Sequence, residues 1–366
     1  MAADLREERR AALRARLTTE ALDGLIVTQP SNVRYLTGFT GTSAVTIVLR
    51  HDTIFVSDFR YRTQADAEVA DAARVEIVAA DLWERVWSVL KEQPGLETLG
   101  FEADTVSVKG AERFVAAREH AGCRFRAVAG LVEALRVRKH PSEVAAIREA
   151  ARLAHAALEA TLPALRPGMR ELDVASALEG ALRRRGSEWH PFPTIAASGP
   201  RSALPHANTA TREIQPGDWL LLDFGARLDG YCADITRTVV VGARPDERQR
   251  TVYALVRDAQ RLARENVRAG MTGAEADALA RQLITSRGFA DAFGHSLGHG
   301  LGLEVHEAPR LSSTNREPLP EGAVVTIEPG IYFPGWGGVR IEDEVHLTAG
   351  GAELLSDGCT ELREIV

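Results

Sequence analysis

The sequence has few cysteines and no long hydrophobic run, and both absences narrow the classes of protein to which it can belong. It contains no run of about eighteen apolar residues, the length that a membrane helix needs, and its first residues lack the apolar segment of a secretory signal. We therefore expect neither a membrane span nor an export signal, and a cytoplasmic location by default. The three cysteines form no C-x-x-C pair, which fits a reducing compartment and gives no thiolate metal site.

The sequence also lacks an excess of positive charge. Its 44 lysines and arginines are outnumbered by 51 aspartates and glutamates, which gives a net charge of -7 at pH 7. The arginine-rich start, REERRAALRAR, contains its own acids and is typical of a solvated helix face. We therefore expect no binding to nucleic acid. The sequence contains neither a Walker loop nor a dinucleotide fingerprint. The segment GHGLGLE comes near the fingerprint but has leucine where its last glycine should be.

The 366 residues are instead sufficient for two globular domains. Residues 1 to about 130 alternate helical patterns with short apolar runs, which predicts an α/β domain. The pattern changes after Val128, and Pro141 begins a long alanine-rich helix. We predict an N-terminal domain over residues 1–134 and a second domain over residues 135–366.

The second domain contains an internal similarity. The segment LRPGMRELDVASALEGALRRRG, from Leu165, aligns with VRAGMTGAEADALARQLITSRG, from Val267. Each segment follows a long predicted helix and precedes extended segments. Chance similarity is the alternative explanation, but the repetition favours a duplicated half with an active site between the two copies.

One glycine-rich stretch is crowded with possible metal ligands. HSLGHGLGLEVHE, residues 295–307, contains three histidines and two glutamates. His295 and His299 have a helical spacing, but each nearby glycine would cost a helix about 1 kcal/mol relative to alanine. A loop that leads into a strand is the better prediction. A solvated turn is the alternative, and three histidines together argue against it.

Two aspartates occupy unusual places in a predicted β-hairpin. In DWLLLDFGARLDGYCADITRTVVVG, a turn at Asp229-Gly230 would make Asp223 and Asp234 diagonal neighbours on one face. Aspartate is normally depleted in apolar strands, which argues against two unrelated surface residues. Two glutamates occupy similarly unusual places: Glu328 ends the apolar strand AVVTIEPG, and Glu342 interrupts GVRIEDEVHL.

These acids predict a metal site. Four buried carboxylates at one point would be prohibitively unfavourable without cations, and two divalent ions carry the matching charge. We therefore predict a dinuclear site formed by five residues: Asp223, Asp234, Glu328, Glu342 and His299. A set rich in carboxylates, with one imidazole, favours manganese, cobalt or iron over structural zinc.

The motifs resemble those of the pita-bread metallopeptidases and, within them, the Xaa-Pro peptidases, which comprise prolidases and aminopeptidases P. The resemblance rests on ASGPRSALPHANT, LLLDFGARLDGYCADITRT, HSLGHGLGLEVHEAPR, VVTIEPGIY and GVRIEDEV. It implies an α/β (α+β) chain with a creatinase-type N-terminal domain and a pita-bread catalytic domain that contains an internal pseudo-two-fold repeat. GYCAD and PHANT vary slightly from the expected patterns, and neither variation touches a ligand position.

The resemblance also implies roles for single residues. The five predicted ligands match the dinuclear positions, with Asp234 and Glu342 as the bridging pair, and Mn²⁺ is preferred over Co²⁺, Fe²⁺ or Zn²⁺. Glu328 would also move protons. Three histidines would line the substrate site: His206, His295 and His306. Arg310 and Arg340 match arginines near the substrate.

The implied reaction is hydrolysis of the Xaa-Pro bond of a proline-containing dipeptide or longer peptide by a homodimer, assisted by two metal ions. A dipeptidase needs a cation for the carboxylate that follows proline, and Arg34 and Arg60 of the N-terminal domain are further candidates. A dipeptidase is therefore slightly favoured over an aminopeptidase P. Two alternatives are a catalytically silent pita-bread protein-binding module and a metal-independent creatinase-like amidinohydrolase. The complete ligand set argues against both.

Overall fold

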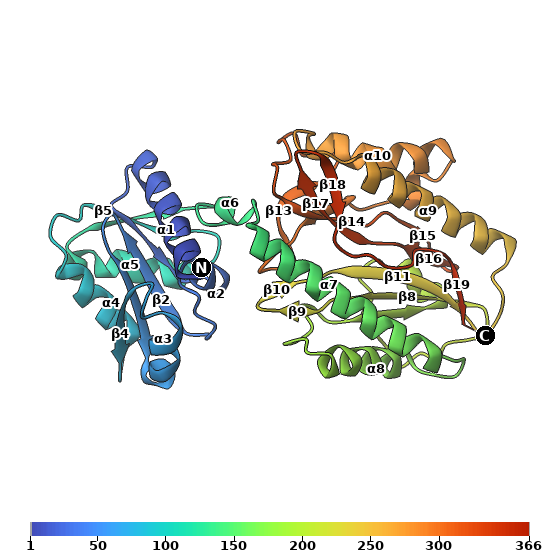
Figure 1. Cartoon of the computed structure of the whole chain (residues 1–366), viewed down its shortest axis with the longest axis horizontal. Coiled ribbons are helices and arrows are strands. Elements are labelled where there is room, and N and C mark those ends of the chain that lie inside the picture. Colours follow the sequence, from blue (N-terminus) through green and yellow to red (C-terminus); the bar gives the residue numbers. More distant parts are fainter. Residues whose placement is uncertain (1, 366) are drawn as a thin grey trace. The chain divides into compact units, whose positions relative to one another are not determined.

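The structure, a computed structural model, describes residues 2–365 and contains two compact units, Met1–Arg136 and Val137–Val366 (Figure 1). The division after Arg136 lies close to the one predicted after residue 134. Each unit has its own sheets and its own hydrophobic core. Among residues 2–365, no helix combines the length and the apolar composition that crossing a bilayer requires.

The N-terminal unit is built around one six-stranded sheet with the order β4-β3-β2-β1-β5-β6. Strands β1, β5 and β6 are parallel, and β2 is antiparallel to both of its neighbours. The strands are β1 (Gly24–Val27), β2 (Ala44–Leu49), β3 (Thr53–Asp58), β4 (Arg74–Val78), β5 (Thr98–Glu102) and β6 (Arg124–Val128). The helices are α1 (Ala2–Thr19), α2 (Pro30–Thr37), η1 (Phe59–Tyr61), α3 (Arg62–Glu68), α4 (Leu82–Lys91), α5 (Val108–Ala121) and α6 (Glu133–Arg136). The short apolar runs of the sequence lie in these strands, which confirms the α/β prediction.

The C-terminal unit contains two larger sheets, with the orders β19-β11-β8-β7 and β13-β12-β14-β17-β18, and two hairpins, β9-β10 and β15-β16. Its helices are α7 (Pro141–Thr161), η2 (Leu162–Ala164), α8 (Glu171–Arg184), η3 (Gly199–Ala203), α9 (Glu247–Asn266), α10 (Gly273–Ser286) and η4 (Ala290–Ala292). Its strands are β7 (Ile195–Ser198), β8 (Asp218–Phe224), β9 (Arg227–Leu228), β10 (Tyr231–Cys232), β11 (Ile235–Val241), β12 (Gly298–Gly300), β13 (Glu307–Leu311), β14 (Val324–Ile327), β15 (Gly330–Phe333), β16 (Gly337–Arg340), β17 (Asp343–Thr348), β18 (Gly351–Leu354) and β19 (Arg363–Ile365).

The internal repeat is visible in the C-terminal unit. Helices α8 and α10, which the two similar segments form, are both 14 residues long and follow the long helices α7 and α9. The matched glycines Gly168 and Gly270, each the fourth residue of its copy, have left-handed φ angles of 84° and 88°. In Figure 1, α7 and α8 lie along one side of the strands and α9 and α10 along the other, each pair over its own hydrophobic core. The two halves therefore enclose the strands that carry the predicted metal ligands.

A buried polar cluster lies where the two halves meet. Arg237 of β11 and Asp343 of β17 form an ion pair with Nη2 2.7 Å from Oδ1, and both side chains are almost fully buried. The ring of His155, on α7, packs against Gly358, where a Cβ would come within 2.2 Å of the ring. Burial, reinforced by the positive charge of Arg237, lowers the pKa of His155 to about 4. The folded protein therefore holds His155 neutral well below neutral pH.

His155 should make the protein less stable as the pH falls from about 6.5 to about 4. In this window the unfolded chain binds a proton on His155 and the folded chain does not, so that the free energy of unfolding decreases with falling pH. The contribution lost at pH 5 is about 2 kcal/mol. Urea unfolding at pH 8 and pH 5 measures the loss of free energy of unfolding between the two pH values. This loss should be about 2 kcal/mol smaller in His155→Gln than in the wild type. An equal pH dependence in both proteins would contradict the prediction.

Candidate functional site

The predicted hairpin turn forms and brings the two aspartates together. Asp229 and Gly230 both have left-handed φ angles, 48° and 77°. The turn sets the register of β8 against β11, in which Asp223 lies opposite Thr236, as predicted from the sequence. Asp223 and Asp234 line the same pocket, which has a volume of about 670 Å³.

The glycine-rich stretch becomes the short strand β12 between two neighbouring strands. A Cβ at Gly298 would lie 2.0 Å from a carbonyl oxygen of β14, and a Cβ at Gly300 would lie 2.1 Å from a carbonyl oxygen of β13. Only glycine fits at these two positions, so that β12 can pass close to both partners. His299 lies between the two glycines, and its side chain reaches the pocket that also holds Glu328 and Glu342.

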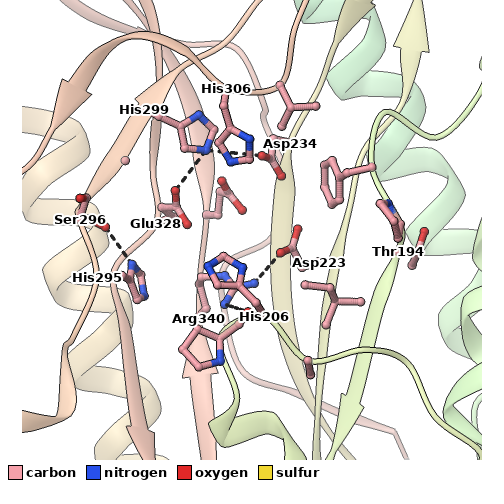
Figure 2. A pocket seen from close by; sticks show the side chains of 18 of the residues that line it. Thr194, His206, Asp223, Asp234, His295, Ser296, His299, His306, Glu328 and Arg340 are labelled. Atoms are coloured by element: carbon pink, nitrogen blue, oxygen red, sulfur yellow. Dashed lines mark hydrogen bonds and ion pairs between the residues drawn. The ribbon is translucent and has the colours of Figure 1, made fainter. Parts of the chain in front are cut away.

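The ligand candidates converge. Asp234, His299 and Glu342 each offer a ligand atom within 4.8 Å of the others, and all three are buried. His299 Nε2 lies 3.7 Å from Asp234 Oδ2 and 3.4 Å from Glu328 Oε1. Figure 2 shows His299, Glu328 and Asp234 around one region, with Asp223 close by. The group formed by Asp234, His299 and Glu342 could hold a metal ion.

The electrostatics of this cluster fit cations. Burial, with the charges of neighbouring carboxylates, raises the pKa values of Asp234 and Glu342 well above their usual range, and burial raises the pKa of Glu328 to about 7. Burial also lowers the pKa of His299 to about 3, which leaves a neutral imidazole. Two buried carboxylate oxygens of the pocket, Asp223 Oδ1 and Glu342 Oε1, have no hydrogen-bond partner among the described residues. Unpaired buried acceptors of this kind are unfavourable, and divalent cations that prefer oxygen ligands would satisfy them.

Arg340 is part of the pocket wall. It is 3% exposed, and its guanidinium donates to Asp223 Oδ2 at 2.5 Å, to Tyr332 Oη at 2.9 Å and to Thr236 Oγ1 at 3.0 Å. Its donors are therefore directed at protein groups in this structure. The expectation that it also contacts substrate stays a prediction.

Tyr332 was missed by sequence reasoning, although it ends the quoted motif VVTIEPGIY. Its hydroxyl lies 2.9 Å from His295 Nε2, and His295 Nδ1 lies 2.8 Å from the Ser296 carbonyl oxygen. Because a carbonyl only accepts, Nδ1 carries the proton and Nε2 accepts from the tyrosine. Burial lowers the pKa of His295 to about 4, so that the ring is neutral. Both ring nitrogens have protein partners, and a hydrogen bond from His295 to substrate would need to replace one of them.

The other predicted residues divide between the two units. His206, His306 and Arg310 line the same pocket, and the His306 ring lies 4.3 Å from that of His299. Arg34 and Arg60 belong to the N-terminal unit, where Arg60 is exposed and lies 2.7 Å from Asp58. A role for these two arginines at the pocket stays a prediction.

A buried ion pair that the sequence did not reveal holds the loop before β13. Lys139 Nζ lies 3.1 Å from Glu307 Oε2, and the two side chains are 1% and 6% exposed. Glu307 directly follows His306, and its other oxygen accepts a hydrogen bond from the Glu304 amide. A Cβ at Gly302 would lie 2.9 Å from the Glu307 carboxylate and 3.0 Å from Lys139. The third glycine of the motif therefore leaves room for this pair.

Comparisons with known proteins agree with this geometry. Two family models match: Metallopeptidase family M24 over residues 145–349, and Creatinase/Prolidase N-terminal domain over residues 9–138. The chain is similar to an Xaa-Pro dipeptidase of Pyrococcus furiosus, with 38% identity over 93% of this chain and 95% of the relative.

Solved structures are similar over nearly the whole chain. The Xaa-Pro dipeptidase from Bacillus anthracis has a TM-score of 0.94 and 40% identity, and the match covers 98% of this chain and 99% of that one. The X-Pro aminopeptidase from Thermotoga maritima has a TM-score of 0.90 and 34% identity, over 97% of this chain and 99% of that one. Proteins with both names thus share this fold.

Replacement of Lys139 by methionine should destabilise the C-terminal unit by about 3–5 kcal/mol, because the change removes one charge of a buried ion pair. Urea unfolding of the full chain measures the loss. Arg148→Met is the matched control, because the ion pair of Arg148 with Glu353 is exposed and should contribute less than about 1 kcal/mol. Equally small losses in both variants would contradict a structural role for the buried pair.

Proposed function

This chain belongs to metallopeptidase family M24, and from that membership we propose that it hydrolyses the bond between an N-terminal residue and proline. The names of the similar dipeptidases and aminopeptidase support this substrate class. The observation that carries the proposal is the convergence of Asp234, His299 and Glu342 within 4.8 Å. A silent binding module or a metal-independent amidinohydrolase would have no use for such buried, unsatisfied carboxylates.

The five predicted ligands fit two divalent cations, Mn²⁺ by preference, with Co²⁺, Fe²⁺ or Zn²⁺ as alternatives. The set comprises Asp223, Asp234, His299, Glu328 and Glu342. Cations bound there would acidify a water molecule and polarise the scissile carbonyl. The unpartnered oxygens of Asp223 and Glu342 support this assignment, because they give the set acceptors that the protein leaves free.

The protein groups around this set have separate tasks. Glu328, whose Oε1 lies 3.4 Å from His299 Nε2, is assigned the proton transfer, in which it would accept a proton from water and return it to the leaving nitrogen. Burial lowers the pKa of His306, so that the ring is neutral and can hydrogen-bond the substrate. His206 lines the same pocket and is assigned a similar role. Arg340 holds Asp223 in its orientation by a hydrogen bond of 2.5 Å.

Within the Xaa-Pro peptidases, we favour a dipeptidase. A dipeptide presents a carboxylate directly after proline, and Arg310 at the pocket offers a cation to it. Arg34 and Arg60 of the N-terminal unit are further candidates, from the same chain or from the second subunit of a proposed homodimer.

Asp234→Asn and Glu342→Gln should each lower kcat/KM for an Xaa-Pro dipeptide by about 10³-fold or more, because a bridging ligand serves both ions. Metal analysis of the purified variants should show less bound Mn²⁺ than in the wild type. Asp173→Asn is the matched control, because Asp173 is an exposed partner of Arg170 on α8. Near-wild-type turnover with two bound ions in Asp234→Asn or Glu342→Gln would refute the bridging assignment.

The wild type should cleave an Xaa-Pro dipeptide about ten to a hundred times better than its C-terminal amide or an Xaa-Pro tripeptide, since a charge-assisted contact contributes about 1.5–3 kcal/mol. Arg34→Ala, Arg60→Ala and Arg310→Ala identify the cation, because loss of the correct one should remove the preference. If the tripeptide is cleaved equally well and none of the three arginines matters, the enzyme is an aminopeptidase P.

A further inference from the structure

The segment that carries His295 has no regular secondary structure, yet its backbone is firmly bound. It runs from Phe293 to Leu297, between η4 and β12. Arg281 of α10 donates from Nη1 to the Phe293 carbonyl at 2.9 Å and from Nη2 to the His295 carbonyl at 2.7 Å. The Leu297 amide donates to Asp277 Oδ1 at 3.0 Å and also to a carbonyl oxygen of β13. Two side chains of one helix thus bind the chain before, at and after His295.

The two side chains also bind each other. Arg281 Nε lies 2.5 Å from Asp277 Oδ2, and Nη2 lies 2.9 Å from Oδ1, which is a bidentate contact within one helix. The guanidinium carbon lies 4.2 Å from the centre of the Phe293 ring. Asp277 is 1% exposed. The planar guanidinium is therefore fixed in orientation, and two of its other N–H groups point at the two carbonyls. A lysine could not reproduce this arrangement.

The pair is specific to the copy of the repeat that carries His295. In the alignment of the two similar segments, Ala175 and Glu179 of α8 stand where α10 has Asp277 and Arg281. Both helices pack on a hydrophobic core, so that packing alone does not require the pair. Its distinguishing feature is the segment that it binds.

We propose that Asp277 and Arg281 are positioning residues that hold His295 in the active site. Neither side chain lines the pocket. The His295 ring accepts a hydrogen bond from the Tyr332 hydroxyl, and that hydroxyl accepts one from Arg340. Arg340 in turn holds Asp223, so that fixing His295 also helps to fix these groups. The kinetic part of this inference rests on the proposed function.

The kinetic test compares Arg281→Gln and Arg281→Lys with the matched control Arg152→Gln. The Arg152–Glu149 pair on α7 is exposed and touches no part of the site. Each Arg281 variant should lower kcat/KM for an Xaa-Pro dipeptide by about 10-fold to 100-fold, as expected for displaced catalytic groups. In a His295→Ala background the same Arg281 changes should lower kcat/KM by less than about threefold, because the imidazole that Arg281 positions is absent. A loss of equal size in both backgrounds, or full activity in Arg281→Lys, would overturn the proposal.

Hydrogen exchange tests the same inference without reference to catalysis. Amides of residues 293–300 should exchange faster in Arg281→Gln, and also in Asp277→Asn, which preserves side-chain volume, while Arg152→Gln should match the wild type. Unchanged exchange in both variants would overturn the proposal. If the wild type cleaves no Xaa-Pro peptide, the proposed function fails, and the exchange result still decides whether the pair holds the segment.

Discussion

The burial of several carboxylates at one point is the constraint on which the C-terminal unit depends. Asp234 and Glu342 are almost fully inaccessible, and Glu342 and Asp223 each keep an oxygen without a protein donor. Such groups are unfavourable in a low-dielectric interior unless cations accompany them. They also repel one another, and only a stiff backbone holds repelling groups together. This explains why the ligands lie on or beside paired strands.

Much of the remaining site supports that backbone. Gly298 and Gly300 let β12 pass within contact distance of the carbonyls of its neighbours, and the pair of Lys139 with Glu307 secures the loop that carries His306. Arg340 supplies a permanent positive charge beside Asp223 and is itself fully enclosed. The fixed charge of Arg340 and the charges of any bound cations would together neutralise the carboxylates.

The sequence predicted those parts of the site that follow from local rules. The Asp-Gly turn determined the register of β8 against β11, and acids in apolar strands revealed the ligand candidates. Tyr332 and Lys139 were missed because their partners lie elsewhere in the chain; Lys139 and Glu307 are 168 residues apart. Asp277 and Arg281 have an ordinary helical spacing, and their sequence does not show that they also bind the backbone of the segment with His295. Arg340 was found, but not its enclosure by Asp223 and Tyr332, because sequence spacing does not reveal which donors the fold already uses.

The repeat has a consequence for how the protein responds to its environment. Asp234 follows the first copy, whereas His299 and Glu342 follow the second, so that an ion held by these three residues would be coordinated from both halves. Coordination across the two halves would act as a cross-link that the unfolded chain does not possess. An ion at a free concentration a hundred times its dissociation constant would then add about 2.7 kcal/mol to the free energy of unfolding. A shortage of metal would thus lower the stability of the folded enzyme as well as its activity.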